Sequence, residues 1–147
     1  MISFNFKIIA VGKIKDLNLN NKIEEYLKRL SHDTKTDIIE IKDSNPLSEG
    51  LKIQEILKKE NSFSIALTEE GKTYGSIDFS RYLAAIPGKI TFVIGGPFGL
   101  SEQVKNTCRQ RLSLSPMTFT HEMARLLLLE QLYRAVSIQN NRSYHKE

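Results

Sequence analysis

Cysteine and tryptophan are almost absent from this chain of 147 residues, which has one cysteine, four prolines and no tryptophan. Because Cys108 has no partner, an internal disulfide is excluded, and this composition is typical of a reducing compartment. Long apolar runs are also missing, since residues 8–11 and 126–129 are far too short for a signal sequence or a membrane span. We therefore expect a cytoplasmic protein with no membrane partner.

Motifs that would identify a cofactor or a metal are absent or incomplete. The chain has no G-x-x-x-x-G-K-[ST] sequence, and the turn at residues 95–99 is not the G-x-G-x-x-G of a dinucleotide site. Residues 121–125, His-Glu-Met-Ala-Arg, miss the zinc motif H-E-x-x-H at its last position, so we predict no metal. A nicotinamide-dependent enzyme stays an alternative, although it would need an acidic residue near the first turn, where Lys13 and Lys15 stand.

The charge of the chain is mildly positive and unevenly distributed. There are 21 Lys and Arg against 17 Asp and Glu, which gives a net charge of +4 and a pI near 9.2. On composition alone, a solvated lysine surface explains this excess. Position is more informative, because Arg125, Arg134, Arg142 and Lys146 all follow the glycine-rich turn at residues 95–99. A basic patch beside a ligand site favours an anionic partner, usually nucleic acid.

Apolar β-type runs alternate with helical patterns along the whole chain. This alternation predicts parallel strands joined by helical crossovers, and hence a three-layer α/β domain over residues 1–147. Strands are expected at residues 6–11, 37–41, 63–67, 90–94 and 112–115, with a polar turn at 68–72 after the third. Helices are expected at residues 19–31, from Pro46 onward, at 76–86 with Ser76 as N-cap, after an N-cap at Ser101, and at about 120–139.

Two of the expected strand ends indicate a ligand pocket. The run at 90–94 ends in Gly95-Gly96-Pro97-Phe98-Gly99, and the run at 112–115 ends in a turn at Pro116. Glycines at a strand end let a ligand approach the backbone, and ligands of open α/β sheets bind beyond the carboxyl ends of the strands. We therefore predict a small-molecule pocket here. The alternative is that the glycines only form a tight strand-to-helix turn.

The last predicted helix is apolar on more than one face. Its apolar residues cover more of the circumference than one sheet face would bury: Met123, Leu126, Leu127, Leu128, Leu129, Leu132, Tyr133, Val136 and Ile138. In a small domain the simplest cover for a second face is another subunit related by a two-fold axis, which predicts a homodimer. A helix wedged within its own fold is the alternative.

Polar residues at the two ends of this helix are candidates for chemistry. His121 lies in its first turn, where the helix dipole favours a neutral imidazole able to accept a proton; a surface histidine near a cap is the alternative. The tail carries Arg142, Tyr144, His145 and Lys146, a set suited to phosphate contact, base stacking and proton transfer. The alternative for the tail is a frayed terminus.

Several short motifs are distributed from the first expected strand to the last residues. They are Lys7-Ile8-Ile9-Ala10-Val11-Gly12-Lys13, Val93-Ile94-Gly95-Gly96 with Gly99-Leu100, Leu114-Ser115 with Met117-Thr118-Phe119, His121, Arg125, Glu130-Gln131 with Tyr133-Arg134-Ala135, and Tyr144-His145. Together they resemble the RlmH family, bacterial SPOUT-class methyltransferases that modify N3 of a pseudouridine in large-subunit ribosomal RNA. The resemblance covers essentially the whole chain and is most specific in its C-terminal half.

This resemblance implies a fold and a cofactor that the residue pattern alone does not. It implies a SPOUT-type mostly parallel sheet with a C-terminal trefoil knot, an arrangement otherwise almost absent from proteins. It also implies a homodimer in which the tail of one subunit closes the active site of the other. S-adenosyl-L-methionine is the implied cofactor, at the positions of Leu67, Gly95, Leu114, Ser115, Pro116, Met117, Thr118 and Phe119.

The activity that the resemblance implies is methyl transfer to N3 of a pseudouridine, with the assembled ribosome as the favoured substrate. His145 and His121 are candidate bases for the N3 proton, with His145 favoured and Tyr144 stacking on or orienting the base. A non-catalytic ribosome-associated RNA-binding protein is the alternative, which explains the basic tail but not the glycine pocket. Contacts with RNA phosphates are expected from Arg125, Arg134, Arg142 and Lys146.

Overall fold

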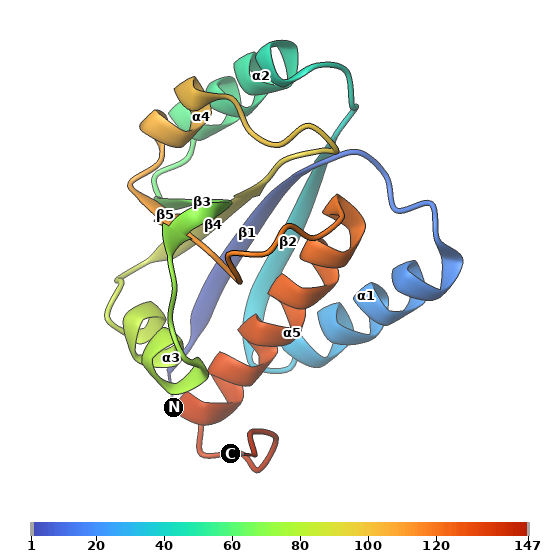
Figure 1. Ribbon diagram of the computed structural model, residues 1–147. Helices are drawn as coiled ribbons and strands as arrows, with labels where there is room; N and C mark the ends of the chain where they lie inside the picture. The colour runs from blue at the N-terminus through green and yellow to red at the C-terminus, as the bar shows by residue number, and fades with distance from the viewer. Residues whose placement is uncertain (1, 147) are drawn as a thin grey trace.

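A sheet of five parallel strands organises the chain, of which the computed structural model describes residues 2–146 (Figure 1). The strands are β1 (Phe4–Val11), β2 (Thr34–Ile41), β3 (Phe63–Lys72), β4 (Lys89–Ile94) and β5 (Gln110–Leu112), in the sheet order β2-β1-β4-β3-β5. The helices are α1 (Leu17–Leu30), α2 (Pro46–Lys59), α3 (Ser76–Ala84), α4 (Glu102–Thr107) and α5 (His121–Gln139).

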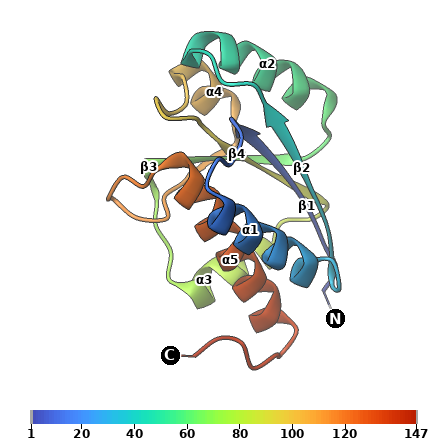
Figure 2. The same ribbon diagram turned by 90° about the vertical axis from the view of Figure 1, so that its right-hand side faces the viewer.

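Helices cover both faces of this sheet. Figures 1 and 2 show α1, α3 and α5 together on one face and α2 with α4 on the other, in agreement with the contacts between these helices. Along β1, Phe6 and Ile8 pack into the core on the α5 side, whereas Ile9 and Val11 pack with Ile53 of α2. This alternating burial confirms the predicted three-layer α/β fold. The trefoil knot stays a prediction.

Helix caps locate most helices where the sequence predicts them. The side chains of Asp16, Asn45, Ser101 and Thr120 each accept a hydrogen bond from a backbone N–H in the first turn of the helix that follows. The predicted N-cap at Ser76 is wrong. Gly75 occupies that position without a side-chain bond, and the Ser76 hydroxyl instead donates to Gln131 on α5 over 3.3 Å.

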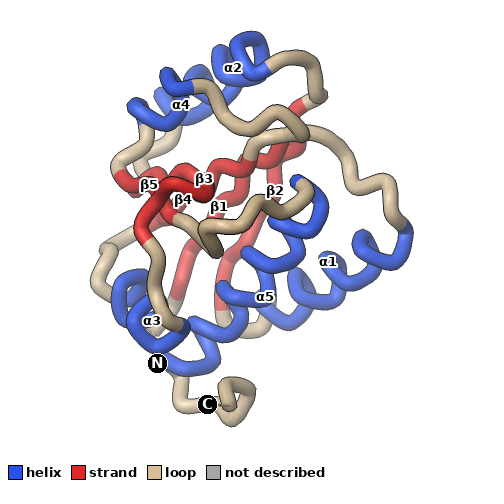
Figure 3. Tube along the Cα trace, in the orientation of Figure 1, coloured by secondary structure: helices blue, strands red, loops and turns tan. Residues whose placement is uncertain are grey.

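The third and fifth strands differ from their predicted ranges. β3 runs on to Lys72, through the segment predicted as a polar turn, and β5 occupies Gln110–Leu112 rather than residues 112–115. Leu67 and Lys72 both pair with Leu112, so β3 contains a bulge. An added Cβ at Gly71 would lie 2.7 Å from the backbone of Arg111 and Leu112, which explains why a glycine stands where these strands meet. Figure 3 shows this shorter β5 and the long loop that follows it.

Helix α5 lies between α1 and α3, so its own fold covers much of the apolar surface that the sequence shows. Leu128, Leu129, Leu132 and Val136 are buried in the core beneath it. This position favours the alternative of a helix wedged within its own fold for these residues. Met123, at 38% exposure, faces outward and is available to a second subunit. No helix within residues 2–146 is long and apolar enough to cross a bilayer.

Candidate functional site

A cavity of about 940 Å³ lies beyond the carboxyl end of β4, bounded by three stretches of chain. They are residues 67–69 of β3, residues 94–100 at the end of β4 and after it, and residues 114–124 before α5 and in its first turn, without Pro116 and Met123. Asp16, Leu19 and Lys105 complete the lining. The chain leaves β4 toward α4 on one face and leaves β1 and β3 toward α1 and α3 on the other. A crevice opens at such a switch point in parallel sheets, as the sequence predicts. Its volume is in the range of small-molecule sites.

The glycine-rich turn forms one wall of the cavity and is very tight. The N–H of Gly99 donates to the carbonyl oxygen of Gly96 over 3.0 Å, and Gly99 has a φ of +78°. An added Cβ at Gly95 would lie 2.6 Å from the carbonyl carbon of Gly99 and 2.9 Å from the nitrogen of Leu100. Gly95 is therefore required for a tight strand-to-helix turn, which was the alternative to a ligand role for these glycines. Gly95 also lines the cavity.

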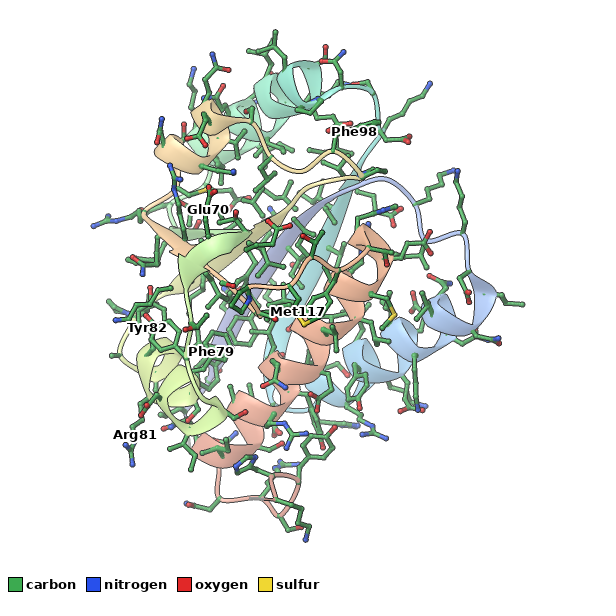
Figure 4. All side chains as sticks on the ribbon, viewed as in Figure 1. Glu70, Phe79, Arg81, Tyr82, Phe98 and Met117 are labelled. Carbon is green, nitrogen blue, oxygen red and sulfur yellow. The ribbon has the colours of Figure 1, made fainter. Side chains whose placement is uncertain are left out.

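The loop between β5 and α5 forms the opposite wall. The Ser115 hydroxyl accepts a hydrogen bond from the N–H of Met117 over 3.0 Å, and the Thr120 hydroxyl caps α5. Figure 4 shows Met117 on this loop and Phe98 on the glycine turn, and both side chains are more than 70% exposed. Of the residues predicted to hold the cofactor, the lining includes Leu67, Gly95, Leu114, Ser115, Met117, Thr118 and Phe119 and does not include Pro116.

His121 and Arg125, one turn apart on α5, both meet Gly12 at the end of β1. An added Cβ at Gly12 would lie 3.6 Å from Nε2 of His121, and the imidazole also lines the cavity. Arg125 is 2% exposed; its guanidinium donates to the Gly12 carbonyl oxygen over 2.7 Å and to Glu40 over 2.5 Å. This buried, bonded position contradicts the prediction that Arg125 contacts RNA phosphates. It is a structural link between α5, β1 and β2.

Carboxylates at the cavity were not predicted from the sequence. Asp16, Glu69 and Glu122 all line it. Glu122 accepts hydrogen bonds from the backbone N–H groups of Lys15 and Asp16, each over 3.1 Å, and so ties α5 to the loop after β1. The only sequence signal for this contact is an acidic residue in the first turn of α5. No group of three His, Cys, Asp or Glu within residues 2–146 could hold a metal.

The tail folds back onto α5 as a hydrogen-bonded cluster, and its described residues do not line the cavity. The Tyr144 hydroxyl donates to Glu130 over 2.6 Å and lies 2.9 Å from the hydroxyl of Tyr26, which donates to it. Burial, together with the hydrogen bonds to Glu130 and Tyr26, raises the pKa of Tyr144 above its usual value. The phenol is therefore a protonated donor. Neither Tyr26 nor Glu130 was predicted in this role.

Arg134 connects this cluster to His145. Its guanidinium donates to Glu130 over 2.9 Å, lies 4.9 Å from the centre of the Tyr144 ring, and is 3.0 Å from Nδ1 of His145. Because a guanidinium can only donate, Nδ1 must be the acceptor, and a neutral His145 carries its proton on Nε2. In this arrangement Nε2 cannot accept a proton. His145 would need to leave Arg134 to act as a base.

The remaining predicted RNA contacts lie at the end of the chain. Arg142 is exposed and forms a salt bridge of 2.7 Å with Asp33, and Lys146 is exposed. Helix α5 has 19 residues and hence a length of about 28 Å. Its first residue, His121, lines the cavity, whereas the tail packs beside its second half. The structure thus separates the predicted site into a cavity group and a tail group within one chain.

Comparisons with known proteins identify relatives of this chain in sequence and in fold. A family model described as "Predicted SPOUT methyltransferase" matches residues 4–145. Proteins named "Ribosomal RNA large subunit methyltransferase H" from Prochlorococcus marinus and Clostridium botulinum are 48% and 45% identical, and the matches cover 97% of this chain and 97% and 99% of those proteins. A solved structure of a probable methylase family protein from Haemophilus influenzae superimposes with a TM-score of 0.56 at 17% identity, covering 98% of this chain and 70% of that one, which supports the fold.

Proposed function

Because this chain belongs to the SPOUT methyltransferase family, we propose that it is a single-domain enzyme that methylates N3 of a pseudouridine in large-subunit ribosomal RNA. The observation that carries the proposal is the cavity, in which the glycine turn, β3 and the loop before α5 converge. Relatives that match over 97% of the chain and carry the name of a ribosomal RNA methyltransferase support the substrate class. An enzyme with this substrate would act in the cytoplasm, where ribosomes are assembled.

S-adenosyl-L-methionine fits the donor set of the cavity. The backbone and side chains of Leu67, Leu114 and Phe119 offer an apolar wall for an adenine, with the Gly95 backbone beside it. Ser115 and Thr118 add hydroxyl groups, and the carboxylates of Glu69, Asp16 and Glu122 are complementary to a ligand that carries positive charge. When bound, this cofactor supplies an electrophilic methyl group on its sulfonium. Pro116 does not line the cavity and is left with a backbone role in the turn.

The chain must also accept the N3 proton of the target base. His121 is the histidine that lines the cavity, so it is the candidate base for a target that enters the cavity of its own chain. His145 lies on the tail and is hydrogen-bonded to Arg134 of the same chain. To act as the base, it would have to leave Arg134 and enter the cavity of another subunit. The two candidate bases therefore lead to different predictions. If His121 is the base, one chain is sufficient for proton transfer, whereas His145 as the base requires two chains.

A homodimer would bring the two separated groups together. Met123 and the partly exposed Leu127 give the outward side of α5 an apolar contact surface. Two copies of α5 related by a two-fold axis would present the tail of each chain to the cavity of the other. Tyr144 and His145 would then close the neighbouring site, and Arg134, Arg142 and Lys146 would contact RNA phosphates. This arrangement makes the assembled ribosome, with its folded RNA surface, the favoured substrate.

The test combines ligand binding with methyl transfer. Calorimetric titration of the purified protein with S-adenosylmethionine and with NADH should give binding of the first only. Ribosomes from cells that lack the protein should then accept tritium from methyl-labelled S-adenosylmethionine. Binding of NADH alone would indicate a dehydrogenase. RNA binding without cofactor binding or transfer would indicate a non-catalytic ribosome-associated protein, and either result would overturn the proposal.

A further inference from the structure

Phe98 is the most exposed of the large apolar side chains within residues 2–146, at 79%. It lies at the tip of the glycine turn between β4 and α4, and it lines the cavity (Figure 4). Single exposed apolar residues are ordinary on protein surfaces. Leu47 and Leu51 of α2 are also exposed but do not line the cavity. Phe98 and Met117 are both exposed and line it, and of these two only Phe98 has an aromatic ring.

The turn holds Phe98 outward by its backbone rather than by packing of the ring. Pro97 restricts the backbone before it, and the hydrogen bond from Gly99 to Gly96 closes the turn around it. The approach of Gly95 to Gly99 leaves no room for even a methyl group. A side chain with only two torsions on so constrained a backbone loses little conformational entropy when something packs on it. The ring is therefore a preformed contact surface.

The loops that follow β1 and β2 end at the same edge of the sheet as the glycine turn and carry exposed lysines as well as the carboxylates of Asp16 and Asp43. An added Cβ at Gly96 would lie 3.0 Å from Val11, and the Gly12 N–H donates to Ile41, so the ends of β1, β2 and β4 meet at one edge. Lysines on the loops that follow β1 and β2 are exposed, and no salt bridge involves them within residues 2–146: Lys13, Lys15 and Lys42. An exposed aromatic ring and exposed cations at one edge of the sheet favour nucleic acid over an apolar protein surface.

We propose that Phe98 is a stacking platform for an unpaired base of the RNA substrate, a step that rests on the proposed function. N3 of a pseudouridine lies on the pairing edge of the base, so a base that is methylated there must be unpaired and turned out of its stack. Turning a base out loses stacking energy, which an aromatic side chain at the mouth of the site can restore. Phe98 thereby selects single-stranded RNA at the entrance of the cavity without contacting the methyl donor.

Steady-state methylation of ribosomes by the intact protein tests this role. Phe98→Ala and Phe98→Leu should both lower kcat/KM for ribosomes by roughly 5- to 150-fold, the range for loss of one stacked base. Phe98→Trp should retain wild-type kcat/KM, and the dissociation constant of S-adenosylmethionine should be unchanged in all three. Leu51→Ala, an exposed apolar residue away from the cavity, is the matched control and should be neutral. Wild-type kcat/KM in Phe98→Leu would refute stacking, because leucine keeps apolar bulk without a π-face.

Because the chain has no tryptophan, Phe98→Trp also provides a direct optical probe that does not depend on turnover. Its fluorescence should be quenched, and protected from acrylamide, on addition of ribosomes, whereas a tryptophan placed by Leu51→Trp should not respond. If the wild type transfers no methyl group, the proposed function fails, and a response of Phe98→Trp would still report a base contact. Weaker cofactor binding or dimerisation in Phe98→Ala would overturn the inference and assign the ring to the cofactor or to the second subunit.

Discussion

Arg125 of α5 donates a hydrogen bond of 2.7 Å to the carbonyl oxygen of Gly12, which directly follows β1. This bond crosses from the first strand to the last helix, and it lies one helical turn from His121 at the cavity. The same guanidinium reaches Glu40 on β2. The sequence predicts that Arg125 contacts RNA. In the structure Arg125 instead fixes the position of α5, the helix that carries the candidate base His121.

Replacing Arg125 should destabilise the fold. Arg125→Ala leaves the Gly12 carbonyl oxygen without its donor and removes a buried guanidinium that also pairs with the exposed Glu40. We expect this loss to cost about 2 kcal/mol in the free energy of unfolding. Arg81→Ala is the matched control, because both side chains of its salt bridge with Asp78 are exposed and the pair should be worth less than about 1 kcal/mol. Urea unfolding of both variants gives the comparison. Equal stability of the two variants would contradict a structural role for Arg125.

Gly95 should tolerate no side chain. An added Cβ would contact the Gly99 backbone at 2.6 Å, so Gly95→Ala must displace the turn that forms one cavity wall. We expect at least a tenfold loss of S-adenosylmethionine affinity, about 1.4 kcal/mol, by calorimetric titration. Gly75→Ala is the control, because no atom lies within 4 Å of its added Cβ. If both variants bind the cofactor equally well, the glycine turn is not part of the cofactor site.

The strands that the sequence predicts well are those buried on both faces. Residues 8–11 of β1 and most of the β4 segment are apolar runs, the sequence pattern typical of interior parallel strands. β3 and β5 were mispredicted where they meet at the edge. Residues 68–72 are polar, and a glycine there looks like a turn, but Gly71 instead permits close approach of the β5 backbone. Pairing between distant segments outweighs local preference at that edge.

The cavity residues were predictable because strand ends define them, whereas the position of each charged group was not. Burial of Arg125 depends on Gly12 and Glu40, more than 80 residues away in the sequence. Similarly, Tyr144 contacts Tyr26, 118 residues distant, and no local pattern contains that pairing. Residue type identifies what a side chain can bind, but the fold decides which partner it meets.

The thiol of Cys108 should be inert in the native protein. Burial raises its pKa from 9.0 to about 11, so at pH 8 the native thiol is protonated and a disulfide reagent should modify it only after unfolding in urea. The folded state holds this proton more tightly than the unfolded state. Its contribution to stability is therefore full below pH 9 and is lost as the pH rises to about 11. Cys108→Ala should remove this loss of stability between pH 9 and about 11. Fast modification of the native wild-type thiol at pH 8 would contradict the prediction that Cys108 is inert.

Two inactive variants should complement each other if the site is shared between subunits. Gly95→Arg disrupts the glycine turn that forms one cavity wall but keeps the tail. Deletion of residues 143–147 removes the tail but keeps the cavity. In a shared site each mixed dimer has one intact site of two, and random pairing makes about half of the dimers mixed. Roughly a quarter of the wild-type activity should return after subunit exchange. Activity at background, with mixed dimers present by native mass spectrometry, would show that each tail serves its own chain.

The decisive measurement is nucleoside mass spectrometry of ribosomal RNA after incubation with the purified protein. Ribosomes from cells lacking the protein would be treated with S-adenosylmethionine that carries a deuterated methyl group, and the large-subunit RNA would then be digested. We predict one labelled nucleoside, a pseudouridine with the deuterated methyl group on N3, formed by the wild type and absent with Gly95→Arg. RNA without label, although the protein binds ribosomes, or label on another base, would contradict the proposed activity.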